Sequence, residues 1–267
     1  MFRALAADVR EMFQEQVDFR ELLYQMTRRD LMLRYKQTVM GFGWAIFSPL
    51  INTIIFTVIF TQAAPLNVGM PYPLYAYCGQ LAWNFFASSL RFSVNSLTAN
   101  INLVAKVYFP REIFPFSAVV VSAVDFAVGS IVLVGMMIWY RVPVTFAVAF
   151  LPVIIVVHVL FTAGIALLLA MANLFYRDVK YLFEVGITML MFASSALYPV
   201  TEFKDPLRTI LQLNPMTSII DAYRAVLLRG TLPDLVPLAW AAAVAVIILS
   251  AGWLTFHRSE YRFAEYI

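Results

Sequence analysis

The sequence predicts an all-α integral membrane fold with six transmembrane helices per subunit, an N-terminal amphipathic interfacial helix and short re-entrant helices between the fifth and sixth spans. Hydrophobic residues make up 62% of the 267 positions and charged residues 13%, with a mean hydropathy of +0.79. Soluble domains carry about 45–50% and about 25% respectively. Residues 37–90 also contain no Asp, Glu, Lys or Arg. An apolar excess arranged in such long runs must face lipid.

The charge-free runs have room for six spans, because a membrane-spanning helix needs about 20 apolar residues. Residues 37–90 hold two of them, separated by a turn between Pro65 and Pro73. The third contains one charge, Asp125, which should face protein or water and bond Ser122, Ser130 or a neighbouring span. The six expected spans are Phe42–Thr61, Leu74–Arg91, Phe116–Tyr140, Ala147–Ala170, Phe183–Tyr198 and Leu235–Phe256.

The Lys and Arg residues predict the orientation of these spans. Fourteen lie in the N-terminal segment, the second and fourth loops and the tail, whereas five lie in the other loops. Loops rich in Lys and Arg stay in the cytoplasm, so both termini are expected there. The chain then divides into a cytoplasmic N-terminal segment (1–37), a six-span domain (38–257) and a cytoplasmic tail (258–267).

The N-terminal segment has an apolar helical face. Phe19, Leu22, Leu23 and Met26 fall at positions i, i+3, i+4 and i+7. We expect an amphipathic helix lying in the cytoplasmic membrane interface. The alternative is a soluble helix packed on other loops of the protein.

The segment Pro199–Asp234 is too long for a turn and too apolar for a solvated loop. Pro206 and Pro215 divide it into pieces shorter than a span. Short apolar helices of this kind are candidates for re-entrant segments, which are stable only where protein or a cavity covers the broken backbone.

The sequence lacks the motifs of most catalytic classes. It has no phosphate-binding loop for ATP, no dinucleotide-binding glycine motif and no zinc motif, and its single cysteine, Cys78, excludes an intrachain disulfide. The net charge of +3 is explained by membrane orientation, so no nucleic-acid partner is expected. Transport or scaffolding remains, and a permease that dimerises and docks a separate motor fits better than a secondary transporter, which normally shows internal repeats and paired intramembrane charges.

Several strings in the loops occur in a fixed order along the chain. Together they resemble the signatures of polysaccharide-exporting type-2 ABC transporter permeases. The strings are Arg29-Asp30-Leu31, Arg34-Tyr35-Lys36, Gly41-Phe42-Gly43-Trp44, the second loop from Asn102 to Ile113, the fourth loop from Asn173 to Val179, Leu197-Tyr198-Pro199-Val200, and Asn214 to Arg224.

The resemblance implies a homodimeric permease of the bacterial inner membrane that works with two copies of a separate ABC ATPase. It implies that ATP and Mg are bound by that ATPase, with no cofactor in this chain. The cargo would be a lipid-linked polysaccharide of the O-antigen, capsule or teichoic acid kind, on undecaprenyl pyrophosphate or a phospholipid. Alternatives are a type-2 ABC permease for a drug or lipid, an ion-coupled secondary transporter, and a non-transporting membrane scaffold.

The resemblance also implies roles for particular residues. Two cytoplasmic loops would couple to the ATPase, with exposed aromatic residues as anchors; the residues are Asn102, Leu103, Lys106, Tyr108, Phe109, Pro110, Arg111, Tyr176, Arg177 and Asp178. The N-terminal helix would form a cytoplasmic gate. An outer gate would contain Tyr198, Pro199, Asn214, Pro215, Tyr223 and Arg224.

Cargo chemistry adds two further expectations. Guanidinium groups pair well with phosphate, so Arg28, Arg29, Arg34 and Lys36 are candidates for the lipid-phosphate entrance, the alternative being attraction to anionic membrane lipids. Aromatic side chains can lie against the apolar faces of sugar rings, so Trp44, Tyr77, Trp83 and Phe86 are candidates for the glycan channel. The alternative is that they are ordinary interfacial or lipid-facing aromatic residues.

Glu184 is expected to reach water or to pair with Lys180.

Overall fold

The computed structural model describes residues 14–36, 38, 40–41, 43–63, 66, 68–106 and 109–265. Over these ranges the chain is helical and no strand occurs, which confirms the all-α class. The helices are α2 (Arg20–Tyr35), α3 (Gly43–Val58) with the π-turn η1 (Ile59–Ala63), α4 (Tyr72–Ser96), η2 (Thr98–Asn100), α5 (Ile101–Lys106), α6 (Ile113–Trp139), η3 (Phe146–Phe150), α7 (Leu151–Phe175), α8 (Val179–Phe192), η4 (Val200–Glu202), α9 (Leu207–Leu213), α10 (Pro215–Arg224), η5 (Ala225–Arg229), α11 (Leu235–Ser259) and η6 (Glu260–Glu265).

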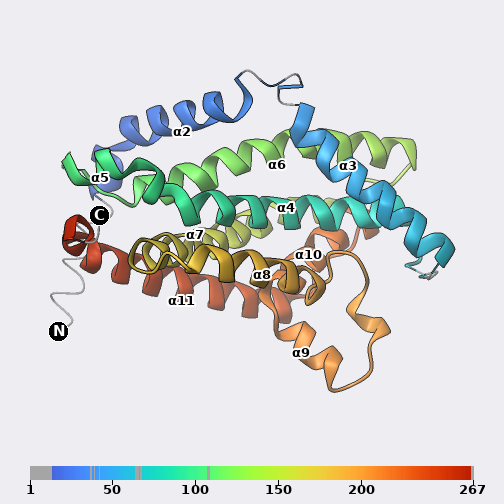
Figure 1. The fold of residues 1–267 in the computed structure, drawn as a ribbon. Helices are drawn as coiled ribbons and strands as arrows, with labels where there is room; N and C mark the ends of the chain where they lie inside the picture. The colour runs from blue at the N-terminus through green and yellow to red at the C-terminus, as the bar shows by residue number, and fades with distance from the viewer. Residues whose placement is uncertain are drawn as a thin grey trace.

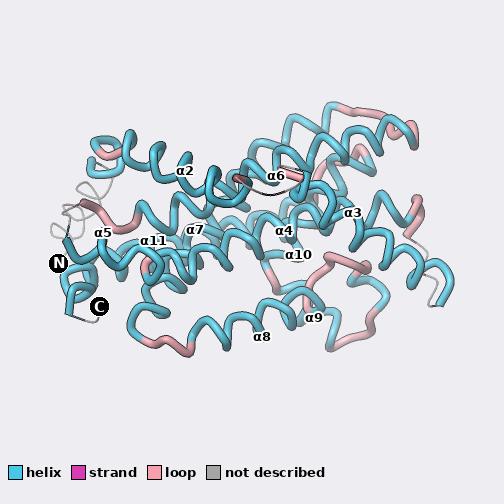
Figure 2. The backbone as a smooth tube through the Cα atoms, turned by 45° about the horizontal axis from the view of Figure 1, so that its top comes forward, coloured by secondary structure: helices cyan, strands magenta, loops and turns pink. Residues whose placement is uncertain are grey.

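The long helices run side by side, with α4 in the middle (Figure 1). Helix α4 packs on α3, α6 and α7, and α11 packs on α7. Helix α2 lies along one half of α6, and the short helices α9 and α10 lie at the opposite end of the bundle from α5 (Figures 1 and 2). We call these two ends the α5 end and the α9 end. The connection between α7 and α8 and the turn η6 are also at the α5 end.

Four helical stretches in the described residues are long and apolar enough to cross a membrane, namely Gly43–Gln62, Ile113–Trp139, Phe146–Phe175 and Leu235–Phe263. They correspond to the first, third, fourth and sixth expected spans. The second expected span is α4, which is long but carries Gln80, Asn84 and Arg91. The fifth is α8, whose 14 residues extend about 21 Å, short of a hydrocarbon core of about 30 Å. The six-span count therefore stays a prediction.

The fifth expected span ends earlier than the sequence indicated. Helix α8 ends at Phe192, although apolar residues continue to Tyr198. The hydroxyl of Ser194 donates to the Met191 carbonyl at 2.8 Å, and the Ser195 hydroxyl donates to the Thr217 carbonyl of α10 at 3.3 Å. The break is thus made by side chains and by contacts with α10, which a hydropathy pattern does not contain.

Close packing of α7 on α11 depends on two glycines. A Cβ on Gly164 would lie 2.6 Å from the backbone nitrogen of Leu249, and a Cβ on Gly252 would lie 2.8 Å from the Gly164 carbonyl oxygen. Small residues at a helix crossing let two backbones approach, and this is how helices associate in lipid, where apolar burial gives little driving force. The two glycines therefore fix the α7–α11 pair that supports the centre of the bundle.

The apolar face of the N-terminal helix packs on the protein. Phe19, Leu22, Leu23 and Met26 are partly buried against a cluster at the α5 end that includes Phe109, Phe114 and Phe256. This matches the alternative of a helix packed on other parts of the chain. Placement of α2 in the membrane interface stays a prediction.

Candidate functional site

The first candidate site is the break between α8 and α10, where the guanidinium of Arg224 is buried. It donates to the Ser195 carbonyl at 2.5 Å, to the Ala196 carbonyl at 2.9 Å and to the Tyr75 carbonyl at 3.3 and 3.4 Å. It also lies 3.5 Å from the centroid of the Tyr75 ring and 3.3 Å from the Asp221 carboxylate. Carbonyls freed by a broken helix need donors when water is absent, and one side chain supplies them here.

Asn214 holds the other end of α10 to the same break. Its amide oxygen accepts from the Met216 backbone N–H at 3.0 Å and caps α10, with Pro215 in the first turn. Its amide nitrogen donates to the Ala193 carbonyl at the end of α8, at 2.9 Å. The two ends of α10 are therefore tied to consecutive parts of residues 193–196.

The remaining predicted outer-gate residues lie around this break. Tyr198 donates to the Phe192 carbonyl and packs on Phe203, with ring centroids 5.2 Å apart. Pro199 precedes the turn η4. Tyr223 is buried, and its hydroxyl lies 3.4 Å from Nδ1 of the buried His158. The structure brings the predicted set together at the α9 end and adds a residue that the sequence did not single out, Gly79, where a Cβ would lie 2.3 Å from both the Ala196 oxygen and the Arg224 guanidinium.

The second candidate site joins α2 to α6. The Arg34 guanidinium is ion-paired with the Asp125 carboxylate, and the Tyr35 hydroxyl donates to the same carboxylate. Arg34 also lies 3.7 Å over the Phe92 ring. Burial, followed by the adjacent carboxylate, raises the pKa of the Tyr35 hydroxyl to about 12, so it stays protonated and donates at neutral pH.

Asp125 faces protein and a cavity, as expected, but the expected bonds with Ser122 and Ser130 were wrong. Ser122 and Ser130 each donate to a carbonyl of their own helix, at 3.0 and 2.8 Å. Asp125 follows the first residue of α6 by 12 positions, about 18 Å along the helix. Two signals could have predicted the pair with Arg34: a lone carboxylate in the apolar third span, and a cation shortly before the first span.

Two cavities adjoin this ion pair. One, of about 470 Å³, is lined by residues of α2, α4 and α6. The other, of about 320 Å³, lies between α2, α3, α4 and α6. Arg34 and Arg91 line both cavities. Besides these two arginines, the lining of the second has polar groups from Tyr35, Trp44, Ser48, Asn52, Asn84, Ser88, Ser122 and Asp125, and apolar groups from Ala45, Pro49, Leu81, Phe85 and Phe126.

The predicted phosphate-entrance residues differ in their surroundings. Arg28 and Lys36 are exposed on α2 and at its end. Arg29 is paired with the neighbouring Asp30 at 2.8 Å. Arg34 already has the partner described above, and Arg91, which the prediction omitted, joins it in both cavities. Arg91 pairs with Glu184 at 3.1 Å, and the Glu184 side chain is 54% exposed; of the two expected alternatives, Glu184 therefore reaches water and does not pair with Lys180.

Three of the four predicted channel aromatics are core residues. Tyr77 and Phe86 are fully buried and Trp83 is 3% exposed. Tyr77 donates to the Gly129 carbonyl at 3.0 Å, and the ring centroid of Phe86 lies 5.5 Å from that of Trp83. These side chains are buried because α4 is surrounded by other helices. Only Trp44, 46% exposed, stands at a polar cavity.

In the second loop, the predicted anchor Phe109 is not exposed. Its side chain is 5% exposed and packs on Phe114, with ring centroids 5.5 Å apart. Pro110 is buried as well. Tyr108 and the side chain of Lys106 lie outside the described residues. Asn102 is exposed and Leu103 is half-buried on α5.

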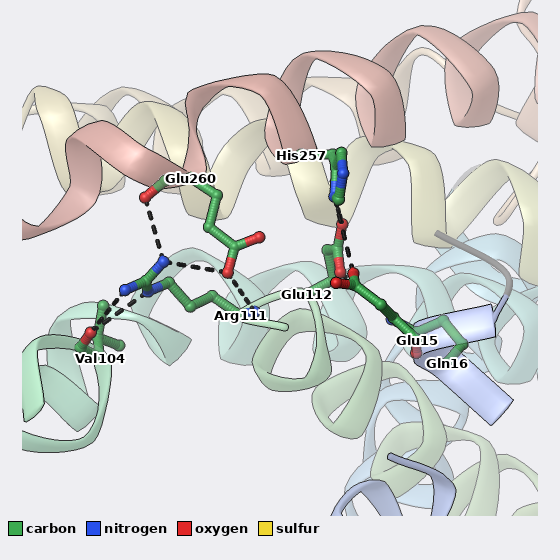
Figure 3. A network of polar contacts seen from close by, with 7 residues as sticks. All are labelled: Glu15, Gln16, Val104, Arg111, Glu112, His257 and Glu260. Carbon is green, nitrogen blue, oxygen red and sulfur yellow. Dashed lines mark hydrogen bonds and ion pairs between the residues drawn. The ribbon is translucent and has the colours of Figure 1, made fainter. Parts of the chain in front are cut away.

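Arg111 of the same loop is engaged within the chain (Figure 3). Its guanidinium donates to the Val104 carbonyl at 3.2 and 3.3 Å and to the Glu260 carboxylate at 3.1 Å. Its backbone N–H donates to the same carboxylate at 3.0 Å. Arg111 therefore ties α5 to η6 at the end of the chain.

Sequence reasoning also missed Glu112, which is fully buried. Its carboxylate accepts from Nε1 of Trp253 at 3.1 Å and from Nε2 of Gln16 at 3.3 Å, and Nδ1 of His257 lies 3.2 Å away (Figure 3). The signal was present as Trp253 and His257 four positions apart, which places both on one face of the last helix.

The fourth loop is exposed, as docking to a partner would require. Tyr176 is 73% exposed, and Arg177 and Asp178 are exposed between α7 and α8. A cavity of about 250 Å³ lies between the two loops. It is lined by Thr98 and Ile101 just before the second loop, by Arg177 of the fourth loop and by Lys180 of α8.

The described residues form long apolar helices that surround cavities lined partly by polar side chains. This arrangement is that of an integral membrane protein with polar groups in its interior, a class that includes membrane permeases. Residues 21–228 match the family described as ABC-2 type transporter. The chain belongs to this family.

Three relatives have similar sequences over nearly their whole length. The chain is 30% identical over 261 residues to the O-antigen export system permease protein RfbA of Myxococcus xanthus, which covers 97% of this chain and 98% of the relative. It is 29% identical to two proteins of the same name from Klebsiella pneumoniae, over 247 and 248 residues. Each of these matches covers 92% of this chain and 94% of the relative.

Proposed function

We propose that the chain is the membrane permease subunit of an ATP-driven exporter that moves a lipid-linked polysaccharide of the O-antigen kind from the cytoplasmic side across the bacterial inner membrane. The observation that carries this proposal is the end-to-end similarity to three permeases named for O-antigen export. ATP and Mg are bound by a separate ABC ATPase, and this chain supplies the pathway. Six spans would put both termini on the same side of the membrane, and the distribution of Lys and Arg residues assigns that side to the cytoplasm.

The α5 end is the cytoplasmic, ATPase-facing end. The exposed fourth loop and the exposed part of α5 supply the docking surface, with Arg177 and Lys180 beside a cavity that the two loops share. The buried Phe109 and the internally bonded Arg111 support this surface from below.

The cavities around Arg34 and Arg91 form the entrance for the phosphate head group of the carrier, either undecaprenyl pyrophosphate or a phospholipid. Two guanidinium groups that line one cavity suit a doubly charged pyrophosphate. The hydroxyl and amide groups of the adjoining cavity, together with Trp44, suit the first sugar, since sugars present polar rims and apolar faces. Exposed Arg28 and Lys36 attract the anion to this entrance.

The permease acts as a homodimer. Helix α3 is little covered by the rest of the chain, and Ile51, Ile54, Ile55 and Val58 are exposed along it. Helix α8 exposes Leu182, Val185 and Met189. A second copy would cover part of these faces and complete a conduit that one bundle alone does not enclose.

Deletion of the gene tests this function. We expect finished polymer to accumulate inside the cell and to disappear from the surface, with recovery when the gene is restored. Normal surface polymer in the deletion strain would contradict the proposal. A purified complex with an ABC ATPase should hydrolyse ATP faster when the lipid-linked glycan is added. If a drug or a free lipid stimulates ATP hydrolysis and the glycan does not, the chain is a type-2 ABC permease for a drug or lipid. Transport without an ATPase would favour an ion-coupled secondary transporter.

A further inference from the structure

Arg111 and Glu112 are neighbours in the second loop, yet their side chains tie this loop to different segments (Figure 3). Arg111 holds Val104 of α5 on one side and Glu260 of η6 on the other. Glu112, the last residue before α6, holds Trp253 and His257 of α11 and Gln16 of the N-terminal segment. Both residues therefore contact the end of the chain, at α11 and at the turn that follows it.

The turn η6 extends these contacts to the fourth loop. Phe263 of η6 is fully buried. Its ring centroid lies 5.1 Å from that of Phe256 on α11 and 5.7 Å from that of Phe175, the last residue of α7. Tyr176 follows directly in the exposed loop. One short turn thus contacts the second loop through Glu260 and the base of the fourth loop through Phe263.

The contact with Gln16 extends the network toward α2. Residues 14–18 are helical and lead directly into α2, whose far end is ion-paired with Asp125. A displacement of Glu112 therefore has a bonded route to the helix that borders both Arg34 cavities.

We infer that Arg111, Glu112, Glu260 and His257 form a coupling clamp, which makes the second loop, the C-terminal turn and the N-terminal segment move together when the ATPase acts on the loops. Glu112 is the positioning residue at its centre, and α2 is the element that it moves. The inference rests on the proposed function for the ATPase partner. A buried polar network whose members are all bonded is rigid, and packed elements shift as bodies between discrete arrangements.

The test is the isosteric substitution Glu112→Gln in the full permease–ATPase complex. The amide removes the negative charge and presents an N–H group where Gln16 or His257 now donates. We expect assembly and basal ATP hydrolysis to persist, while export per ATP hydrolysed falls about tenfold, within the range measured for coupling residues. Glu21→Gln is the matched control, because Glu21 is exposed on α2 and bonds only Gln25 in the described contacts, at 2.8 Å.

A charge exchange tests the other half of the clamp. Arg111→Glu and Glu260→Arg should each uncouple export from hydrolysis. The double variant should recover part of the coupling, because it restores the ion pair with its signs reversed but not the donation to the Val104 carbonyl. Wild-type coupling in Glu112→Gln and in both single variants would overturn the inference. Loss of assembly in all of these variants would also overturn it, because the residues would then serve folding and not coupling.

Hydrogen–deuterium exchange tests the clamp independently of whether the exported cargo is a polysaccharide. In the wild-type complex, ATP with vanadate should change the exchange of residues 20–35, and Glu112→Gln should abolish that change. A retained change in Glu112→Gln would refute the clamp. A change that depends on Glu112 in a complex that does not export polysaccharide would uphold the clamp and refute the proposed cargo.

Discussion

The guanidinium of Arg34 on α2 is ion-paired with the carboxylate of Asp125 on α6, across 91 positions of sequence. The side chains of this pair are only 14% and 19% exposed. The pair fixes the C-terminal end of α2 near the middle of α6. It also places Arg34, one of the cations of the proposed entrance, against the Asp125 carboxylate of the same chain. A phosphate that binds Arg34 must therefore compete with Asp125.

Asp125→Asn should destabilise the protein by about 1–3 kcal/mol, because Arg34 keeps its charge in a partly buried place over Phe92 after the counter-ion is lost. Thermal unfolding in detergent measures the change. Glu184→Gln is the matched control. Its ion pair with Arg91 is about half exposed, with side-chain exposures of 54% and 48%, so it should cost less than about 1 kcal/mol. Equal effects of the two substitutions would contradict the assigned burial.

Arg224→Ala should cost about 3 kcal/mol or more, since it leaves the Ser195 and Ala196 carbonyls of the break without the guanidinium that donates to them. Arg224→Lys should recover part of the loss, because an ammonium keeps the charge but cannot reach all the acceptors of the guanidinium in the same geometry. Proteolysis at residues 193–200 and the unfolding midpoint report the effect. Arg229→Ala, at an exposed position five residues later, should leave both unchanged.

Gly79→Ala should lower stability and export, because the new Cβ would lie 2.3 Å from the Ala196 oxygen and from Nη2 of Arg224. Gly135→Ala is the control, since nothing lies within 4 Å of a Cβ at that position. The control should be neutral or should stabilise its helix by up to about 1 kcal/mol. Unfolding midpoints of the two variants side by side decide the matter, and a neutral Gly79→Ala would contradict the close approach.

Alanine substitutions of the two tryptophans predicted for the channel should differ in their effects on stability and on export. Trp83→Ala should cost about 3–5 kcal/mol, because the side chain is 3% exposed in the core. Trp44→Ala should leave stability nearly unchanged and should slow export, since the ring is 46% exposed beside the polar cavity. Unfolding midpoints and export rates test this, and wild-type export in Trp44→Ala would remove Trp44 from the pathway.

Arg177→Glu should weaken ATPase binding by about tenfold or more without a change in unfolding midpoint, because Arg177 is exposed in the fourth loop and a charge reversal acts on the partner. Titration of the purified ATPase onto permease in nanodiscs measures the affinity. Arg208→Glu is the control, because Arg208 is exposed on α9 at the opposite end of the bundle. Equal losses in both variants would argue against docking at the fourth loop.

The sequence predicted those helices correctly whose position depends only on a long apolar run. The first, third, fourth and sixth expected spans coincide with apolar helices of spanning length, and α9 and α10 follow the two prolines that were expected to divide the long loop. The predicted end of the fifth span lies too far along the chain, because the end of α8 depends on donation from Arg224 to the Ser195 carbonyl and from the Ser195 hydroxyl to the α10 backbone. No local pattern records those bonds.

Residue type was a poorer guide to the sites than to the spans. Tyr77, Trp83 and Phe86 are aromatic residues of the type that can pack against sugars, but neighbouring helices bury this part of α4 and make them core residues. Phe109 likewise fits an anchor by type and is buried by the Phe256 cluster. The exposed Tyr176 and Arg177 were predictable because their loop is short and its helices end on either side.

Arg224 donates hydrogen bonds to carbonyls that precede it in the chain, at the break after α8, and this order affects how the protein is inserted into the membrane. During synthesis the carbonyls of Ser195 and Ala196 leave the ribosome before the guanidinium that they need. Lipid offers no substitute donor. In the predicted re-entrant arrangement, residues 193–196 therefore cannot reach their final depth until α10 has followed them, and we expect α8 and α10 to enter the bilayer together as one unit.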